Sequence, residues 1–381
     1  MAQHKNRWLW LVFIWLLGLI GLPAASLADD PRGIEVTLGK QQVVFPNGYR
    51  GLQYFPDVQM SLLNTKPVTF LVVATDSTFL MQGRTLEAAV PIKKVLAPGD
   101  KTSFDNGYAG ISSTYFDKGK NELLGFYHAE DHVGMPKPAF NPDLKGSYWT
   151  VALAISKDNG QSFVRTGAII SCSITKDKAT RDYQGVGAPC VGTDPTNTYL
   201  YAYYTDLTRR KDRFSGSIAL ARSRISDGGR PGTWFKYHRG EFSEKGLGGE
   251  ESPVVEPPLR LPSDIVDPHV TWIPAWKKYV MFCTVNAYSD FEKKKAEQGG
   301  IFYCSSDDGI KWTEPKRLIV AHAVPFLDRE YVAHPCLHVE KVESDKATGW
   351  LFYCYSPRWG TAAPRQPHHL ARRAVTLTNR P

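Results

Sequence analysis

The sequence predicts an all-β fold, a five-bladed β-propeller, and three observations support this prediction. Short strands recur in the same order along the chain, one type of tight turn is repeated, and long loops follow alternate strands. Five units of three or four strands can be laid out in this way. Closing such units into a ring protects the sheet edges from pairing with other chains. A six-bladed ring with one unrecognised blade is the alternative.

The repeated turn has the form Ser-x-Asp-x-Gly-x-x-aromatic. It occurs at 156–163 and 305–312, and a looser version runs over 223–234. In such a turn the Asp side chain accepts hydrogen bonds from nearby backbone N–H groups, and Gly tolerates a positive φ. The turns resemble the Asp-boxes of sialidases and related β-propellers. This resemblance implies a structural role for Asp158 and Asp307.

The strands can be placed around these turns. Inner strands are expected to begin near Asp57, Asp105, Val186, Val266 and Val332. Second strands are expected at 69–74, 123–128, 199–204, 279–285 and 350–355, and third strands at 78–81, 149–156, 217–223, 300–305 and 369–376. The pattern is weakest in the first unit, where the strands are short, and in the last, where no outer strand is recognisable.

The first residues have the features of a secretory signal. Lys5 and Arg7 precede an apolar run over 8–22, and small residues at 26–28 resemble a cleavage site. The apolar run is shorter than the roughly 20 residues that a membrane-crossing helix needs. We therefore expect residues 1–28 to be a signal peptide, residues 29–381 to be a single domain, and the protein to be secreted or periplasmic. An uncleaved membrane anchor is the alternative.

The charge and the cysteine content of the sequence indicate which ligands and metal sites the protein is expected to have. The formal net charge of +8 is scattered, with no long basic run. This argues against nucleic-acid binding and leaves weak attraction for an acidic glycan. The six cysteines form no Cys-x-x-Cys pair, so a zinc site is not expected, and the sequence leaves open whether they are disulfides or buried thiols. No cofactor is expected, although the central channel could hold a structural cation.

The predicted strand order separates two faces of the ring. Long loops rich in ionisable residues lie on one face, at 130–147, 206–216, 287–299 and 356–368. The turns on the opposite face are short. Because long loops on a rigid scaffold usually carry function, the site is expected on the long-loop face.

Aspartates at the starts of inner strands also point to this face, close to the ring axis. Asp57, Asp105 and Asp267 stand at equivalent positions of three units. Their carboxylates would converge in one funnel, where like charges raise one another's pKa values, as acid/base catalysis requires. The alternative is that each Asp only caps the beginning of a strand.

The architecture and these aspartates resemble the five-bladed propeller glycosidases, glycoside hydrolase families 43 and 32 and their relatives. The resemblance implies that Asp57 is the base or nucleophile and that Asp105 orients and tunes. Asp267 lies in a Val-Asp-Pro sequence similar to the Arg-Asp-Pro element of the invertase group, with Val in place of Arg. The third inner strand contains no Glu, so Glu251 is the candidate general acid and Glu130 the alternative.

Further candidates for substrate binding lie on the same face: Glu130, His132, Asp206, Arg210, His269, His334, Arg358 and Trp359. Arginines hold hydroxyls or carboxylates well, and an indole can stack on a sugar. The sequence thus predicts an exported glycoside hydrolase that cleaves an oligo- or polysaccharide with a carboxylate acid/base pair. A sialidase-like hydrolase and a non-catalytic glycan- or protein-binding propeller are the alternatives, and the missing Glu favours the binding propeller.

Overall fold

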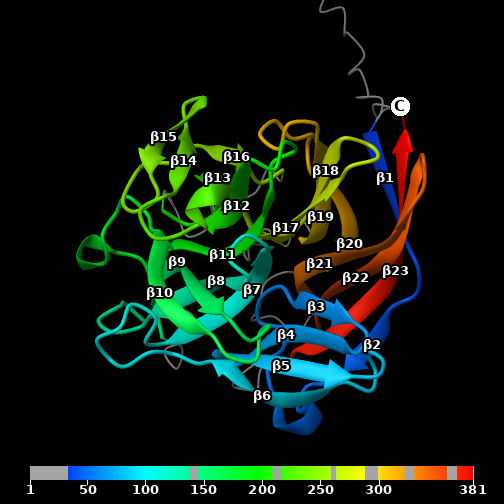
Figure 1. The fold of residues 1–381 in the computed structure, drawn as a ribbon, viewed down its shortest axis with the longest axis horizontal. Coiled ribbons are helices and arrows are strands. Elements are labelled where there is room, and N and C mark those ends of the chain that lie inside the picture. The colour runs from blue at the N-terminus through cyan, green and yellow to red at the C-terminus, as the bar shows by residue number, and fades with distance from the viewer. Residues whose placement is uncertain are drawn as a thin grey trace, which may run out of the picture.

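The computed structural model describes residues 33–137, 145–208, 216–258, 263–287, 299–321, 330–357 and 367–380. Within them the regular structure consists of 23 strands and three single-turn 3-10 helices, so the all-β prediction is confirmed. Groups of strands are arranged around a common centre, as in a β-propeller (Figure 1). No helix in these ranges is long and apolar enough to cross a membrane.

Strand pairing groups the chain into five successive antiparallel units, which we call blades one to five. Blade one comprises β3 (Ser61–Thr65), β4 (Val68–Ala74), β5 (Ser77–Gly83) and β6 (Val90–Leu96). Blade two comprises β7 (Tyr108–Asp117), β8 (Glu122–Asp131), β9 (Ser147–Ser156) and β10 (Val164–Ile170). Blade three comprises β11 (Tyr183–Thr193), β12 (Tyr199–Asp206) and β13 (Ser217–Arg224), edged by β14 (Phe235–His238), β15 (Glu241–Lys245) and β16 (Pro253–Val255).

Blade four comprises β17 (Ser263–Ile273), β18 (Lys278–Ala287), β19 (Gly300–Ser306) and β20 (Lys316–Val320). Blade five comprises β21 (Tyr331–Val342), β22 (Lys346–Ser356) and β23 (His369–Arg380). The second and third strands lie where the sequence predicts them. The outer strand of blade five, which the sequence did not reveal, is supplied by β1 (Gly33–Leu38) and β2 (Gln42–Phe45), which both pair with β23. The two ends of the described chain therefore lie side by side (Figure 1).

The inner strands of blades three, four and five share one irregularity. Each skips two residues in its ladder, between Gly187 and Cys190, Val266 and His269, and Ala333 and Cys336. The first skipped residue has a positive φ and precedes a proline: Ala188 (46°), Asp267 (55°) and His334 (54°). Bulges of this kind turn one side chain out of the regular strand alternation. They give Asp267 and His334 equivalent positions in neighbouring blades.

The next side chain after each of these prolines links neighbouring inner strands. Cys190 Sγ accepts a hydrogen bond from Val270 N–H at 3.2 Å, and His269 Nδ1 accepts one from Leu337 N–H at 3.2 Å. Cys336 Sγ donates to the Met60 carbonyl at 3.1 Å, which joins blade five to blade one. Cys190 and Cys336 therefore act as hydrogen-bonding thiols, and all six cysteines are free and buried.

On the face of short turns, carboxylates accept hydrogen bonds from backbone N–H groups. Asp158 accepts a hydrogen bond from Ser162 N–H at 2.8 Å, and Asp308 accepts from Ile310 and Lys311 N–H at 2.8 and 2.7 Å. Asp308, rather than the predicted Asp307, therefore holds the second turn, because Asp307 points to the surface and pairs with Lys278 at 2.5 Å.

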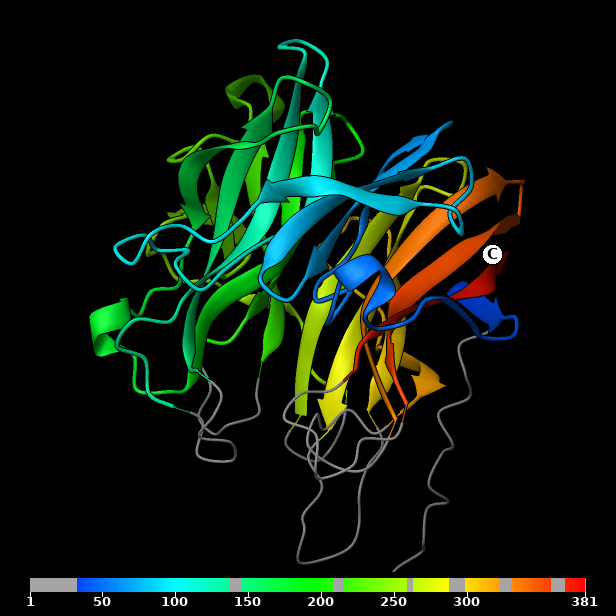
Figure 2. The ribbon, with the colours of Figure 1, turned by 90° about the horizontal axis from the view of Figure 1, so that it is seen from below.

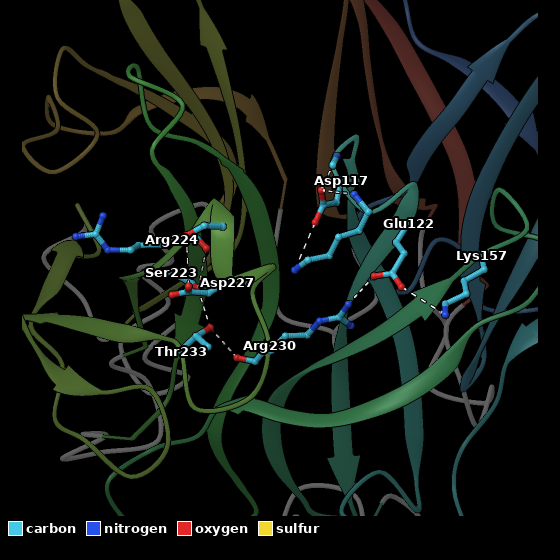
Figure 3. A network of polar contacts seen from close by, with 11 residues as sticks. Asp117, Glu122, Lys157, Ser223, Arg224, Asp227, Arg230 and Thr233 are labelled. Atoms are coloured by element: carbon cyan, nitrogen blue, oxygen red, sulfur yellow. Dashed lines mark hydrogen bonds and ion pairs between the residues drawn. The ribbon is translucent and has the colours of Figure 1, made fainter.

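Ion pairs add to these turns between blades two and three (Figure 3). Glu122 lies between Arg230 at 2.5 Å and Lys157 at 3.7 Å. The described strand ends that border residues 138–144, 209–215 and 288–298 lie at the opposite end of the molecule from these turns (Figure 2). The two faces predicted from the sequence therefore differ as expected.

Candidate active site

Ionisable side chains from four blades gather near the ring axis. We call this group the funnel cluster, and its members are Asp57, Tyr108, His128, Glu130, Asp267, His334 and His368. The buried Tyr108 lies at its centre: burial and the charges of Asp57, Glu130 and Asp267 all raise the pKa of its phenol. Its hydroxyl donates to the backbone carbonyl of Asp57 at 2.8 Å. Of the three aspartates expected to converge, Asp57 and Asp267 lie in this cluster.

Asp57 offers an accessible carboxylate. Its side chain is 29% exposed, and its Oδ1 lies 3.8 Å from Nδ1 of His368. Burial, aided by the neighbouring His334 and His369, lowers the pKa of His368 to about 3, so this imidazole is neutral near pH 7. The Asp57 carboxylate therefore lies beside a neutral imidazole.

Asp267 and His334 form a buried ion pair. Oδ2 of Asp267 lies 3.1 Å from Nδ1 of His334, and the side chains are only 11% and 12% exposed. Burial lowers the pKa of His334, but the charges of Asp267 and Asp57 outweigh it and raise the pKa overall. For Asp267, burial acts to raise the pKa. The contacts with His334 and Thr284 outweigh burial, so the pKa of Asp267 is lowered overall. The Asp267 carboxylate thus favours the imidazolium form of His334.

Glu130 lies between two histidines. His128 and Glu130 lie at the end of β8 and His132 follows just beyond it with the same spacing, so the three side chains share one face. Glu130 is bonded to His128 Nε2 at 2.9 Å and to His132 Nε2 at 2.6 Å. Burial acts to raise the pKa of Glu130, but these two bonds dominate and lower it to about 2. Glu130 is therefore a fixed anion.

A backbone contact fixes the tautomer of His128. Its Nδ1 accepts a hydrogen bond from Ala188 N–H at 3.1 Å, so the ring proton must sit on Nε2, facing Glu130. A Cβ atom at Gly187 would lie 2.1 Å from this Nδ1. Glycine at 187 is thus required for the close approach of the imidazole.

Aromatic rings line the same region on the side of blades two and three. His128 contacts Tyr108 and Trp149 edge to face, with centroid distances of 5.3 and 4.7 Å, and Trp149 lies 6.2 Å from Tyr183. The half-buried indole of Trp149 is oriented by a hydrogen bond from Nε1 to Ser147 Oγ at 2.6 Å. Such a wall suits a ligand with an apolar face.

Asp105 and Glu251 have different surroundings. Asp105 is fully buried and accepts hydrogen bonds from Arg165 Nε at 2.6 Å and from the Tyr127 hydroxyl at 3.1 Å. These contacts attach the segment before β7 to the outer strand β10. Asp105 thus forms an ion pair within blade two, in which the carboxylate is buried and Arg165 is exposed.

Glu251 is 1% exposed and accepts a hydrogen bond from the buried ammonium of Lys236, on β14. Lys236 Nζ also donates to the carbonyls of Ser171 and Gly249 at 2.7 and 2.6 Å. Burial and the nearby Asp206 raise the pKa of Glu251 to about 7, against the opposing effect of Lys236. Glu251 therefore lies in the outer part of blade three.

The remaining predicted binding residues fall into two groups. Asp206 is buried at the end of β12 beside Glu251 and accepts a hydrogen bond from Thr208 N–H at 2.7 Å. His269 accepts the hydrogen bond from Leu337 of blade five described above, and burial lowers the pKa of His269 to about 4. Arg210, Arg358 and Trp359 lie outside the described residues, so their roles stay predictions.

Sequence reasoning did not select Tyr108, His128 or His368. The alternation His-x-Glu-x-His at the end of a strand was a usable signal, since period-2 spacing places all three side chains on one face. Tyr108 and His368 carry no local signal. Among the described residues, no group of three or more His, Cys, Asp or Glu side chains is arranged to hold a metal ion.

No protein-family model matches this chain, and no curated protein matches it. Solved structures match its fold. A glycoside hydrolase has a TM-score of 0.54 at 15% identity, over 89% of this chain and 92% of the other. A family 117 glycoside hydrolase of the marine bacterium Zobellia galactanivorans has a TM-score of 0.53 at 11% identity, over 91% and 92% of the two chains.

An N-acetylgalactosamine deacetylase from F. plautii, solved with the blood group B trisaccharide, has a TM-score of 0.50 at 11% identity, over 90% and 95% of the chains. At such identities the likeness establishes the fold alone. The chain is a β-propeller of the kind found in glycoside hydrolases.

Proposed function

We propose that this protein hydrolyses glycosidic bonds of an oligo- or polysaccharide in the funnel cluster. The observation that carries the proposal is the convergence of an accessible carboxylate, Asp57, with the buried ion pair Asp267–His334. The aromatic wall around Trp149 supports it, because sugars stack their C–H faces on such rings. The similarity in fold to a glycoside hydrolase adds support.

Asp57 is the proposed base. Its side chain is 29% exposed, against 17% for Glu130, which is fixed by two histidines. A carboxylate in hydrogen-bond reach of a water can take its proton as the water attacks. The His368 ring next to it is neutral near pH 7.

The proton donor must carry a proton near neutral pH. Glu130, with a pKa of about 2, and Asp267, whose pKa is lowered, are both ionised, and His368 is neutral. His334 has a raised pKa and is the described member of the cluster that best meets the requirement. Asp267 would orient this imidazolium and keep it protonated.

In this scheme water attacks the anomeric carbon while Asp57 accepts its proton. The bond to the leaving oxygen breaks, and that oxygen takes the proton from His334. A single displacement of this kind inverts the anomeric configuration. Glu251 stays the alternative acid, because its pKa of about 7 suits the task, but its 1% exposure and its pairing with Lys236 favour His334.

The test is release of reducing ends from a panel of plant and algal oligosaccharides. His334→Gln should lower turnover by roughly 10²–10⁴-fold on natural leaving groups and far less on activated aryl glycosides, which need little protonation. Glu251→Gln is the matched variant. If Glu251→Gln shows this leaving-group pattern and His334→Gln does not, the acid is Glu251.

A non-catalytic glycan-binding propeller is the second candidate. Blade three carries Ala188 at the bulge position that holds Asp267 and His334 in the next two blades, so one bulge of the ring brings no ionisable group. Binding of oligosaccharides without any cleavage by the wild type would establish this function instead. Export with removal of residues 1–28 also stays a proposal.

A further inference from the structure

A cavity that is separate from the funnel cluster lies between blade one and blade five. It has a volume of about 200 Å³, and its walls come from β3 and β4 on one side and from β21, β22 and β23 on the other. Pockets for drug-sized ligands measure about 300–1,000 Å³. This cavity is therefore suited to one small ring.

Polar groups line one edge of this cavity. His338 and Glu340 are two residues apart on β21, and both line the cavity, although the ladder with β22 skips Glu340. His338 lies opposite Trp350 in the pairing of β21 with β22. His338 is half-buried and Glu340 is exposed, so a ligand would meet a carboxylate at the mouth and an imidazole further in.

The indole of Trp350 is held in place. The guanidinium of Arg372 lies 4.0 Å from the centre of its ring. Arg372 is itself fixed, since Nε donates to Gln42 Oε1 at 3.1 Å and Nη2 pairs with Glu87 at 2.6 Å. The aromatic wall is thus preorganised, which reduces the entropy lost on binding. The charge of Arg372 is already compensated by Glu87, which disfavours an anionic ligand.

The opposite wall is apolar. Leu62, on β3, and Leu86, in the turn between β5 and β6, are half-buried and line the cavity. A ring that fits must therefore have apolar faces and a hydrogen-bonding edge, without net charge. Sugar rings have this combination: C–H groups on their faces and hydroxyls around their edge.

We propose that this cavity binds one uncharged sugar ring, as a monosaccharide or as the end of a glycan chain. The C–H face would lie against Trp350 and the leucines, and hydroxyls would reach His338 and Glu340. This site does not depend on hydrolysis in the funnel, because the two lie between different sets of side chains.

The experiment uses the full chain carrying Asp57→Asn, so that the funnel cannot turn over the probes. The probes are methyl β-D-galactopyranoside, methyl β-D-xylopyranoside and methyl α-L-arabinofuranoside, with D-glucuronate as the charged counterpart. Saturation-transfer NMR and titration should show binding of at least one neutral probe. Adding Glu340→Gln or Trp350→Leu should weaken it about tenfold or more, given the strength of a hydrogen bond to a charged group.

Thermal melting of each variant confirms that it is folded, and Trp350→Phe, which retains a ring, should bind more tightly than Trp350→Leu. The proposal is overturned if no neutral probe binds, or if D-glucuronate binds better than all three. It is also overturned if Glu340→Gln and Trp350→Leu both leave the affinity unchanged, because the bound probe would then lie elsewhere. Loss of hydrolysis in the funnel would not affect any of these outcomes.

Discussion

The two faces of the ring use charged side chains in opposite ways. On the short-turn face, Asp158 and Asp308 bond to backbone N–H groups and Glu122 is shared between two cations at the surface. In the funnel cluster, the ionisable side chains shift one another's pKa values, and Nδ1 of the half-buried His368 has no hydrogen-bond partner within the described part of the chain. Charges that satisfy the backbone stabilise a turn, whereas charges that shift each other's pKa values are available for a ligand.

The largest expected difference between the faces concerns activity. Asp57→Asn should lower turnover by roughly 10²–10⁴-fold and leave substrate binding intact, because an amide cannot accept a proton from water. Asp158→Asn, on the short-turn face, is the control and should retain wild-type turnover per folded molecule. The measurement is single-substrate kinetics together with the binding affinity of each variant. Loss of turnover in Asp158→Asn would mean that the short-turn face takes part in the reaction.

A second contrast concerns stability. Lys236→Met leaves the Glu251 carboxylate buried beside Asp206 without its cation, and should lower the free energy of unfolding by about 3–5 kcal/mol. Lys157→Met removes one side of an exposed ion pair and should change stability little. Denaturant unfolding at pH 7 gives both values. Similar losses in the two variants would contradict the distinction between buried and exposed pairs.

The pH dependence of stability sharpens the same contrast. The pKa of Glu251 is raised from about 4.5 in the unfolded chain to about 7, so the folded state binds more protons between these values. Its contribution is present below pH 4.5 and is lost as the pH rises through 7. We expect Glu251→Gln to flatten the dependence of the unfolding free energy on pH across this interval, relative to the wild type. A wild-type curve that rises between pH 4.5 and 7 and is unchanged in Glu251→Gln would count against this ionisation.

The smallest expected effect separates two adjacent aspartates. Asp308→Ala should cost roughly 1 kcal/mol because two backbone hydrogen bonds of the turn are lost. Asp307→Ala removes an ion pair at the surface and should be close to neutral. Thermal melts of the two single variants, compared directly, decide which residue holds the turn. A larger loss for Asp307→Ala would restore the assignment made from the sequence.

The strand order could be predicted because alternation and turn residues are local properties of the chain. The positions of Asp57 and Asp267 near the axis followed from this order. Asp105 and Glu251 lie elsewhere because their positions depend on distant cations, Arg165 and Lys236, whose pairing no local pattern encodes. The role of His334 likewise depends on its non-local partner Asp267.

The turn at 305–312 shows a second limit of sequence reasoning. Only Asp307 fits the Ser-x-Asp-x-Gly pattern, but the backbone path places the adjacent Asp308 in the turn instead. The outer strand of blade five could not be found near its blade, since it comes from the other end of the described chain. Local rules thus identified the elements, and long-range pairing decided the partners.

The pairing of β1 and β2 with β23 has a consequence for biosynthesis. Along the chain these two strands precede the five blades, yet their partner β23 is the last of the described strands. The link from Cys336 to Met60 must wait for blade five in the same way. Until then the nascent protein has two unpaired sheet edges, which are sites for chaperone capture or for misassociation with other chains. The ring can therefore close only after β23 has been made, and not during growth of the early blades.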